Sequence, residues 1–243
     1  GKVVTLFEHS SREIGGRART AEIDSFYFNQ GPHALYLTDA TDTILKELGI
    51  TYTGGIPAGK GYLISGGKKR EIAGDYSSWL TGKSDDGRQF FISPTKIDFS
   101  QLESVTEQEW LDKNIHDIND AEIIKTIIRL NTYANDPDIQ SIGPVLHQIY
   151  VGSQAGVMYL DGGWQTLIDG LLTVAKNSNA RIVMGKKAIK VKRTDSSSGW
   201  QVLLSDKTEV SAKIVVIAAG PNDAYSLFDD NERTEVLSKA AKE

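Results

Sequence analysis

The sequence predicts an α/β fold in which helices cover a parallel sheet to give three layers. Two apolar runs, residues 3–7 and 214–220, lack alternation and have the pattern of strands buried on both faces. A helical pattern lies between them in the chain. Its apolar stripe consists of Leu167, Ile168, Leu171, Leu172 and Ala175. Because strands buried on both faces need helices on both sides of a sheet, these observations together predict the α/β class.

The first 50 residues are predicted to begin the sheet and then to leave it. After the strand at 3–7, Gly15 and Gly16 predict a turn, and short β-rich pieces follow. A short amphipathic helix comes next. We expect it to begin with Asp39 as its N-cap and to end before Gly49, which suits the left-handed position after a helix.

Residues 50–98 are predicted to form small antiparallel strands joined by loops. Glycine-containing turns separate three strand-like pieces, which are GYLIS at 61–65, KREIA at 69–73 and RQFFIS at 88–93. This region therefore differs from the parallel sheet expected at the two ends of the chain.

The next region, residues 105–150, has the periodicity of a helical layer. Thr106 and Glu109 form a capping-box pattern, in which each side chain bonds the backbone N–H of the other residue. Isoleucine then recurs at helical spacing. We expect Pro137 and Pro144 to interrupt the helices.

The chain is predicted to return to the sheet after residue 157. Asp161, Gly162 and Gly163 open the amphipathic helix, and three strand-like pieces follow it. These pieces are residues 181–184, 188–192 and 200–204. A polar stretch joins the last two and indicates a hairpin.

Composition and charge exclude several classes of function. With 243 residues, 40% of them hydrophobic, the chain is long enough for one large domain or two small ones. The formal net charge is −5 and no run of Lys and Arg can follow a phosphate backbone, so nucleic acid is not an expected partner. The absence of cysteine excludes disulfides, thiolate zinc sites and redox chemistry based on paired cysteines.

Neither a membrane span nor a metal centre is expected. No apolar stretch reaches the roughly 18 residues that a transmembrane helix needs, and no charged and then apolar leader precedes the first strand. The four histidines lie far apart and lack the spacing of metal ligands. We therefore expect a cytoplasmic protein without a metal site.

Glu8 follows the first apolar strand directly. In a dinucleotide-binding fold the cofactor lies across the carboxyl ends of the parallel strands, and a carboxylate there accepts hydrogen bonds from the hydroxyls of the adenosine ribose. The charge of Glu8 would repel a 2′-phosphate, which disfavours an NADP-type ligand. The alternative is that Glu8 is only the first solvated residue after a strand.

Gly15, Gly16 and Arg17 form the second part of the pattern. Paired glycines allow the backbone to approach a ligand and to adopt positive φ, and a guanidinium can bond a pyrophosphate through two N–H groups. The alternative is a turn followed by a surface arginine. The combination with Glu8 and with NQGPHALY at 29–36 is more specific than any one part.

With these residues in place, the chain resembles the FAD-dependent amine oxidases and phytoene desaturase-like oxidoreductases. In that family a strand ends in Glu, a short loop leads to Gly-Gly-Arg, and an extended segment leads to Gly-Pro-His. The stretches at 159–193 and 214–228 are also similar to the family. The resemblance covers nearly the whole chain and is weakest in the middle.

The resemblance implies contacts with the adenosine and pyrophosphate part of FAD. Glu8 would hold the ribose. Gly15, Gly16 and Arg17 would approach the pyrophosphate, and the backbone at Ala188 would face the adenine.

The resemblance implies that two further segments lie along the rest of the cofactor. Gly31, Pro32 and His33 would lie near the isoalloxazine. Ala219, Gly220 and Pro221 would pass close to the cofactor at the end of the later strand. A histidine beside proline in a turn is more often structural, so His33 is not assigned a catalytic role. The resemblance identifies no catalytic residue.

The sequence departs from the family pattern in two ways. Six residues separate Glu8 from Gly15, one more than the family spacing. The family also begins with a strand and a GxGxxG turn whose helix holds the pyrophosphate. It ends with a glycine-aspartate motif near the flavin. This chain contains neither the first unit nor the last motif. We therefore expect a fragment of a longer oxidoreductase, with an FAD site that is incomplete at both ends.

The absent first strand of the family would lie between residues 3–7 and 214–218. Without it, we expect apolar strand edges to be open. The chain should then be poorly soluble, form a homodimer through that edge, or borrow a strand.

The expected FAD-binding domain comprises residues 1–49 and 151–243, and residues 50–150 form an inserted substrate-binding domain. The resemblance implies hydride transfer to the flavin from a C–H bond of a small-molecule substrate, either an amine or an apolar carbon skeleton. Two alternatives stay open. One is a non-catalytic binding or interaction module that retains the fold, and the other is an unrelated enzyme that uses NAD.

Overall fold

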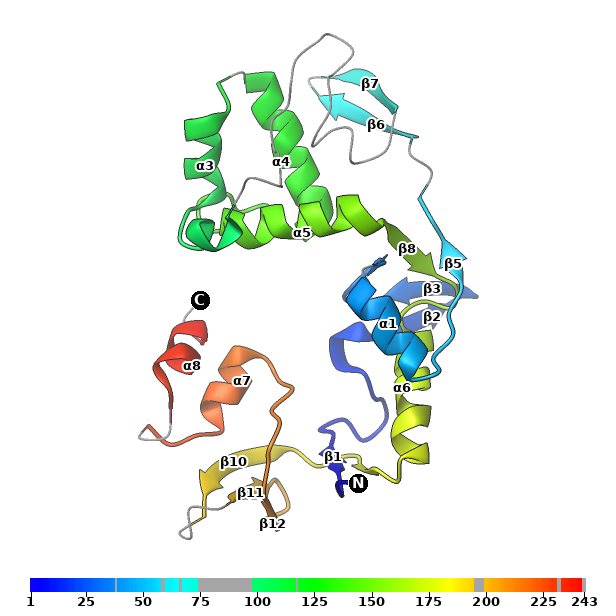
Figure 1. Cartoon of the computed structure of the whole chain (residues 1–243), viewed down its shortest axis with the longest axis vertical. Coiled ribbons are helices and arrows are strands. Elements are labelled where there is room, and N and C mark those ends of the chain that lie inside the picture. Colours follow the sequence, from blue (N-terminus) through cyan, green and yellow to red (C-terminus); the bar gives the residue numbers. More distant parts are fainter. Residues whose placement is uncertain are drawn as a thin grey trace. The chain divides into compact units, whose positions relative to one another are not determined.

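The computed structural model describes residues 1–37, 39–57, 60–65, 67–73, 98–116, 118–194, 199–230 and 233–241 (Figure 1). The chain divides into two compact units: unit 1 contains residues 1–21 and 167–243, and unit 2 contains residues 22–166. Strands and helices occur in both, which confirms the α/β class predicted from the sequence. Within the described ranges, no helix has the length and apolar character of a membrane span.

Unit 1 contains a parallel pair of strands. β1, Thr5–Phe7, pairs with β9, Arg181–Val183, so that Leu6 lies opposite Ile182. The helix α6, Gln165–Asn177, precedes β9, and Asn179 in the turn between them has a left-handed φ of 61°.

Three antiparallel strands follow β9, and these are β10, Ala188–Arg193, β11, Trp200–Leu204, and β12, Glu209–Ala212. The sequence predicted β10 and β11 but missed β12. Their buried core consists of Val191, Val202 and Leu204. Phe7 of β1 and Val215 both pack against this core, so the first strand and the segment after β12 lie at the same cluster.

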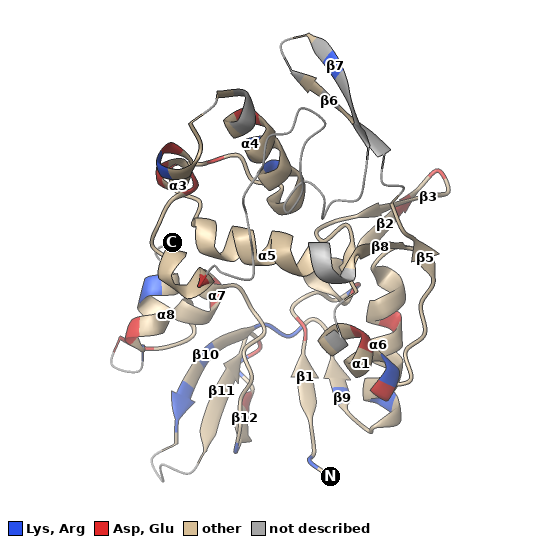
Figure 2. Cartoon of the chain, turned by 45° about the horizontal axis from the view of Figure 1, so that its top comes forward, with Lys and Arg blue, Asp and Glu red and all other residues tan. Residues whose placement is uncertain are grey.

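Two short helices complete unit 1. α7, Pro221–Ser226, begins with proline, whose fixed φ and missing N–H suit the first helical position. α8, Glu235–Ala240, is capped by the Thr234 hydroxyl, which accepts the N–H of Leu237 at 3.2 Å. Charges of both signs occur on α8, whereas the charged residues of β10 are all basic (Figure 2).

Two sequence predictions for unit 1 are wrong. Residues 214–218 form neither strand nor helix, and Val216 is 85% exposed. The segment at 3–7 is not buried, because Val3 is 99% exposed and Leu6 is 43% exposed. The reason is that β1 pairs only with β9 among the described residues, and no described strand pairs with 214–218, so the neighbours that would cover these segments are lacking.

Unit 2 contains a three-stranded antiparallel sheet. Its order is β4, Leu35–Tyr36, then β8, Val157–Leu160, then β5, Gly54–Gly55. A Cβ atom on Gly54 would lie 2.2 Å from the carbonyl oxygen of Tyr159, so only glycine fits there. The helix α1, Asp39–Glu47, lies between β4 and β5 in the chain, and Gly49 follows it with the expected positive φ.

Neighbouring strands also form two hairpins, β2, Thr20–Ile23, with β3, Phe26–Asn29, and β6, Lys60–Ser65, with β7, Lys68–Ala73. Asp24 and Ser25 turn the first hairpin with φ of 49° and 65°, the conformation that matches the twist of the flanking strands. The predicted pieces GYLIS and KREIA are thus confirmed as β6 and β7, whereas RQFFIS lies outside the described residues.

A helical layer forms the larger core of unit 2, with a short 3-10 helix at Phe99–Leu102 followed by α3, Glu107–Asn114, α4, Ile118–Thr132, and α5, Ile142–Ala155 (Figure 1). Its buried residues are Trp110, Leu111, Ile124, Ile128, Ile142, Val145, Leu146 and Ile149. The capping box is confirmed: the Glu109 N–H donates to Thr106 Oγ1 at 3.2 Å, and the Thr106 N–H donates to Glu109 Oε2 at 3.0 Å.

The two prolines of this layer have different effects. Pro137 lies between α4 and α5, as predicted. Pro144 does not interrupt α5, because it lies in the first helical turn, where its missing N–H has no partner within the helix.

Candidate cofactor-binding site

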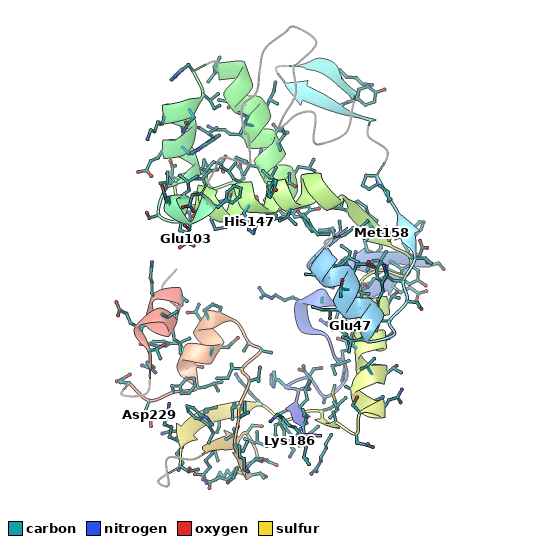
Figure 3. The ribbon with its side chains drawn as sticks, viewed as in Figure 1. Glu47, Glu103, His147, Met158, Lys186 and Asp229 are labelled. Atoms are coloured by element: carbon teal, nitrogen blue, oxygen red, sulfur yellow. The ribbon has the colours of Figure 1, made fainter. Side chains whose placement is uncertain are left out.

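Parallel pairing brings the carboxyl ends of β1 and β9 to the same edge of unit 1. The N–H of Glu8 donates to the carbonyl of Val183 at 2.9 Å and extends the ladder one residue beyond β1. The N–H of Lys186, which Figure 3 labels, then donates to the carbonyl of Glu8 at 2.9 Å. Glu8 therefore lies where a dinucleotide-binding fold places its ligand.

The carboxylate of Glu8 has one bonded oxygen and one open oxygen. Its Oε1 accepts the N–H of Ser10 at 2.7 Å. Its Oε2 has no hydrogen-bond or ion-pair partner within the described part of the chain, and the residue is half-buried. An acceptor held in place by the backbone is therefore available to a hydroxyl donor.

Gly15 and Gly16 both adopt positive φ, of 110° and 53°. A Cβ atom on Gly15 would lie 2.4 Å from Cδ1 of Ile168 in α6, whereas a Cβ atom on Gly16 would meet nothing within 4 Å. Packing therefore requires glycine at 15. At 16 the backbone is left open to a ligand.

Arg17 is exposed, and its side chain has no hydrogen-bond or ion-pair partner among the described residues. The neighbouring Arg19 is different, because its Nε donates to the carbonyl of Gly16 at 3.0 Å and its guanidinium forms an ion pair with Glu13. Arg17 is thus a cation of this turn that can bond an anion without breaking an existing contact.

Ala188, the residue expected to face the adenine, is the first residue of β10. It pairs with Leu204 of β11, and the register of the two strands shifts between Ala188 and Lys190. Such a bulge disrupts the ladder locally. The structure thus places Ala188 next to an irregular part of the strand, two residues after the Lys186 that bonds Glu8.

Lys186 also forms an ion pair with Asp206 in the turn between β11 and β12. This contact, together with the N–H of Thr208, lowers the pKa of Asp206 to about 2. The ammonium group of Lys186 is therefore compensated within the protein.

Ala219, Gly220 and Pro221 connect the extended segment at 214–218 to α7. Ala219 is exposed, and a Cβ atom on Gly220 would meet nothing within 4 Å. The strand expected before these residues is not formed, but their backbone is open to close approach.

The remaining predicted residues, Gly31, Pro32 and His33, lie in unit 2. The His33 ring packs against the Tyr133 ring with centroids 4.7 Å apart. Asn29 connects this segment to the turn before α6, since its Nδ2 donates to the His33 carbonyl at 3.4 Å and its Oδ1 accepts the Trp164 N–H at 3.1 Å. The structure therefore brings eight of the predicted residues into unit 1 and three into unit 2.

Sequence reasoning missed Ser10, Lys186, Asn29 and Trp164. Ser10 had a signal, because a serine hydroxyl in a loop can bond the backbone N–H groups of residues that follow it. Lys186 had a weaker signal, as part of the turn that ends a predicted strand. Trp164 had none, although its Nε1 is buried without a hydrogen-bond partner in the described structure.

Unit 1 thus combines an acid at the end of a parallel strand, two left-handed glycines and a guanidinium without a partner among the described residues, which are features that suit a dinucleotide ligand in an α/β protein. Residues 1–242 match the family model described as flavin containing amine oxidoreductase, and the chain belongs to this family. The resemblance found in the sequence is thus confirmed. A comparison with curated proteins found no match.

Solved structures share the fold at low sequence identity. An oxidoreductase from Methanosarcina mazei matches with a TM-score of 0.70 and 18% identity, over 99% of this chain and 58% of that chain. Putrescine oxidase bound to putrescine matches with a TM-score of 0.68 and 19% identity, over 98% and 57%. For cyclohexylamine oxidase from Brevibacterium oxydans IH-35A the values are 0.64 and 16%, over 98% and 57%. This chain therefore spans less than two thirds of each of these proteins.

The cofactor of the family is FAD. The residues of unit 1 fit its adenosine and pyrophosphate part, because Glu8 presents an open acceptor oxygen, Gly16 leaves space beside the backbone, and the Arg17 side chain has no partner in the described part of the chain. Within the described ranges, no group of three or more His, Cys, Asp or Glu side chains could hold a metal ion.

Proposed function

We propose that the protein of which this chain is part is an FAD-dependent oxidoreductase. The observation that carries the proposal is the open oxygen of Glu8 at the shared end of β1 and β9, in a chain of a flavin-containing family. A ribose offers two hydroxyl donors, and an ionised acceptor fixed by a backbone N–H bonds them strongly.

The proposed roles in unit 1 follow from these contacts. Glu8 holds the ribose, and Ala188 faces the adenine with its backbone. Gly15 and Gly16 let the chain approach the pyrophosphate, and Arg17 bonds its oxygens. Ala219, Gly220 and Pro221 pass close to the cofactor through the open backbone before α7.

The proposed contacts with the isoalloxazine come from Gly31, Pro32 and His33. The ring contact between His33 and Tyr133 supports a structural role for this histidine, because a packed ring fixes the conformation of the segment. Asn29 supports the same role by bonding the His33 carbonyl.

The proposed reaction is the oxidation of a small molecule at a C–H bond next to an amine or in an apolar carbon skeleton. When bound, the flavin supplies the hydride acceptor, and the protein orients the substrate and excludes water. The names of the putrescine and cyclohexylamine oxidases favour an amine. We propose that residues 50–150 shape the substrate cavity and that residues 1–49 and 151–243 bind FAD. We also propose that the protein is cytoplasmic.

The visible spectrum of the purified full-length protein tests the proposal. The protein should keep a flavin spectrum after gel filtration, and Glu8→Ala should lose most of it because the ribose loses its acceptor. Glu22→Ala, which changes an exposed glutamate in β2, should keep the spectrum. A wild-type protein that stays colourless with added FAD would contradict the proposal, and unchanged retention in Glu8→Ala would remove the role of Glu8.

A second candidate function, as an interaction module that pairs with its own copy, is favoured by the open edge of β1. The exposed apolar residues there and at 214–218 are Val3, Val4, Leu6, Ile214 and Val216. An unpaired apolar strand readily adds a strand from another chain, so we propose a homodimer through this edge.

Sedimentation analysis tests the homodimer. Leu6→Lys should shift the protein toward monomer, because an edge lysine opposes strand addition. Ile139→Lys is a matched control at an exposed apolar residue outside the strands, and it should leave the dimer intact. A monomeric wild type, or a Leu6→Lys variant that dimerises like the wild type, contradicts the proposal.

A further inference from the structure

We infer that Ser10 is a positioning residue of the adenosine site, which fixes the Glu8 carboxylate so that its open oxygen meets the ribose hydroxyls. The inference rests on the proposed function, because it assigns a role at the same site. It concerns how that site obtains its affinity for the ribose.

The contact between the two residues is direct. The Ser10 N–H donates to Glu8 Oε1 at 2.7 Å, which is shorter than the roughly 2.9–3.0 Å usual for an N–H···O bond. Bonds of this length are typical of an ionised acceptor. The bond spans two positions in the chain, so it holds the Glu8 side chain back against its own loop.

The main chain of Ser10 is itself fixed to the turn after β9. The Ser10 carbonyl accepts the N–H of Gly185 at 2.9 Å, and the Glu8 carbonyl accepts the N–H of Lys186 at 2.9 Å. Gly185 has a φ of 69°, a left-handed backbone conformation that glycine adopts without strain. The loop is thus tied to the edge of the parallel pair at both residues.

The hydroxyl of Ser10 holds the other side of the loop. Its Oγ accepts the N–H of Arg12 at 3.2 Å and the N–H of Glu13 at 3.0 Å. Serine and threonine form such turns through the hydroxyl, and alanine cannot. Ser11 offers a comparison, since it is exposed and its hydroxyl has no partner among the described residues.

These bonds pre-organise the acceptor. A free glutamate side chain would lose rotamer freedom when it binds the ribose, whereas a carboxylate already held by Ser10 has lost most of it. The effect of Ser10 should therefore depend on the ribose hydroxyls, which a general effect on folding would not do.

Calorimetric titration of the flavin-free chain with ADP and with 2′,3′-dideoxy-ADP tests the inference. The wild type should bind ADP roughly tenfold more tightly than the dideoxy analogue, as expected for hydrogen bonds to a charged group. Ser10→Ala should reduce this ratio to about threefold or less. Ser11→Ala should keep the wild-type ratio.

Ser10→Thr and Ser10→Val provide a second comparison at nearly equal side-chain volume. Threonine should keep the wild-type ratio because it retains the hydroxyl, and valine should lose it. Only variants whose circular dichroism spectrum matches that of the wild type are compared. If Ser10→Ala fails to fold, the comparison of Ser10→Thr with Ser10→Val tests the inference in its place.

The outcomes separate the inference from the proposed function. A wild-type ratio that persists in Ser10→Ala or Ser10→Val, while Glu8→Gln abolishes it, overturns the inference and leaves the proposed function standing. A wild type that binds the two nucleotides equally, or binds neither, overturns both.

Discussion

The side chain of Ile168 fills the space beside Gly15. A Cβ atom at this glycine would come within 2.4 Å of Cδ1 and 3.1 Å of Cγ1 of Ile168. Gly15 also has a φ of 110°, a conformation that other residues rarely adopt. Helix α6 thus supports the glycine turn, and the first loop of the candidate site depends on a helix from the distant second half of the sequence.

Gly15→Ala should lower the free energy of unfolding by about 2 kcal/mol or more, because backbone strain and overpacking against Ile168 act together. Gly16→Ala should cost only about 1 kcal/mol, since its φ of 53° is unfavourable but its surroundings are open. Urea unfolding monitored by circular dichroism measures both. Equal losses in the two variants would contradict the packing argument.

Arg17→Ala should weaken ADP binding roughly tenfold and leave adenosine binding unchanged, because only ADP carries the phosphates that the guanidinium would bond. Unfolding should change little, since the Arg17 side chain has no partner among the described residues. Titration calorimetry with both ligands measures the effect. Arg12→Ala, at an exposed position on the same loop, is the control. A loss that is equal for ADP and adenosine argues against a phosphate contact.

Asp206→Asn should remove part of the acid sensitivity of unit 1. The ion pair with Lys186 lowers the pKa of Asp206 from 3.8 to about 2. Because the pKa is lower in the folded state, the carboxylate stabilises the fold above pH 3.8, and this contribution is lost as the pH falls to about 2.

The unfolding midpoint of wild type and Asp206→Asn across this pH range measures the difference. The two proteins should converge toward its acidic end. Asp138→Asn, at an exposed residue of the loop before α5, should follow the wild type throughout. A constant gap between wild type and Asp206→Asn would refute the linkage.

Glu107→Gln should stabilise unit 2 at neutral pH. Glu107 is 3% exposed, and burial raises the pKa of its carboxyl, although the charges of Lys125 and Arg129 act in the opposite direction. A raised pKa in the folded state means that the carboxyl favours the fold at low pH and that this contribution is lost as the pH rises through the folded value.

Urea unfolding at neutral pH and at about pH 4 tests this sign. The advantage of Glu107→Gln over wild type should shrink in acid. Glu122→Gln, at an exposed position of α4, should show no such dependence. A destabilised Glu107→Gln at neutral pH would show that Lys125 and Arg129 outweigh burial.

Local rules predicted those elements whose causes lie within a few residues. The capping box of Thr106 and Glu109 is such a case, because both of its hydrogen bonds join residues three positions apart. The segment at 214–218 is the opposite case. Its apolar run has the pattern of a buried strand. A strand forms only when a neighbouring strand pairs with it, and the residues of the run itself do not show whether such a neighbour is present.

The candidate site divides in the same way. Glu8 could be found from its position after an apolar run. Its bonds from Val183 and Lys186 could not, because those residues are distant in sequence and meet Glu8 only through the pairing of β1 with β9. The effect of Pro144 could not be predicted from proline alone either, because it depends on where α5 begins.

The pairing of Thr5 with Arg181 also sets the order of events during synthesis. At about 5–20 residues per second, the ribosome needs many seconds to make unit 2 and α6 before β9 emerges. Throughout that interval the nascent β1 is apolar and lacks its partner β9. Unit 1 consequently cannot pair β1 with β9 until residues 22–166 of unit 2 and helix α6 have been made.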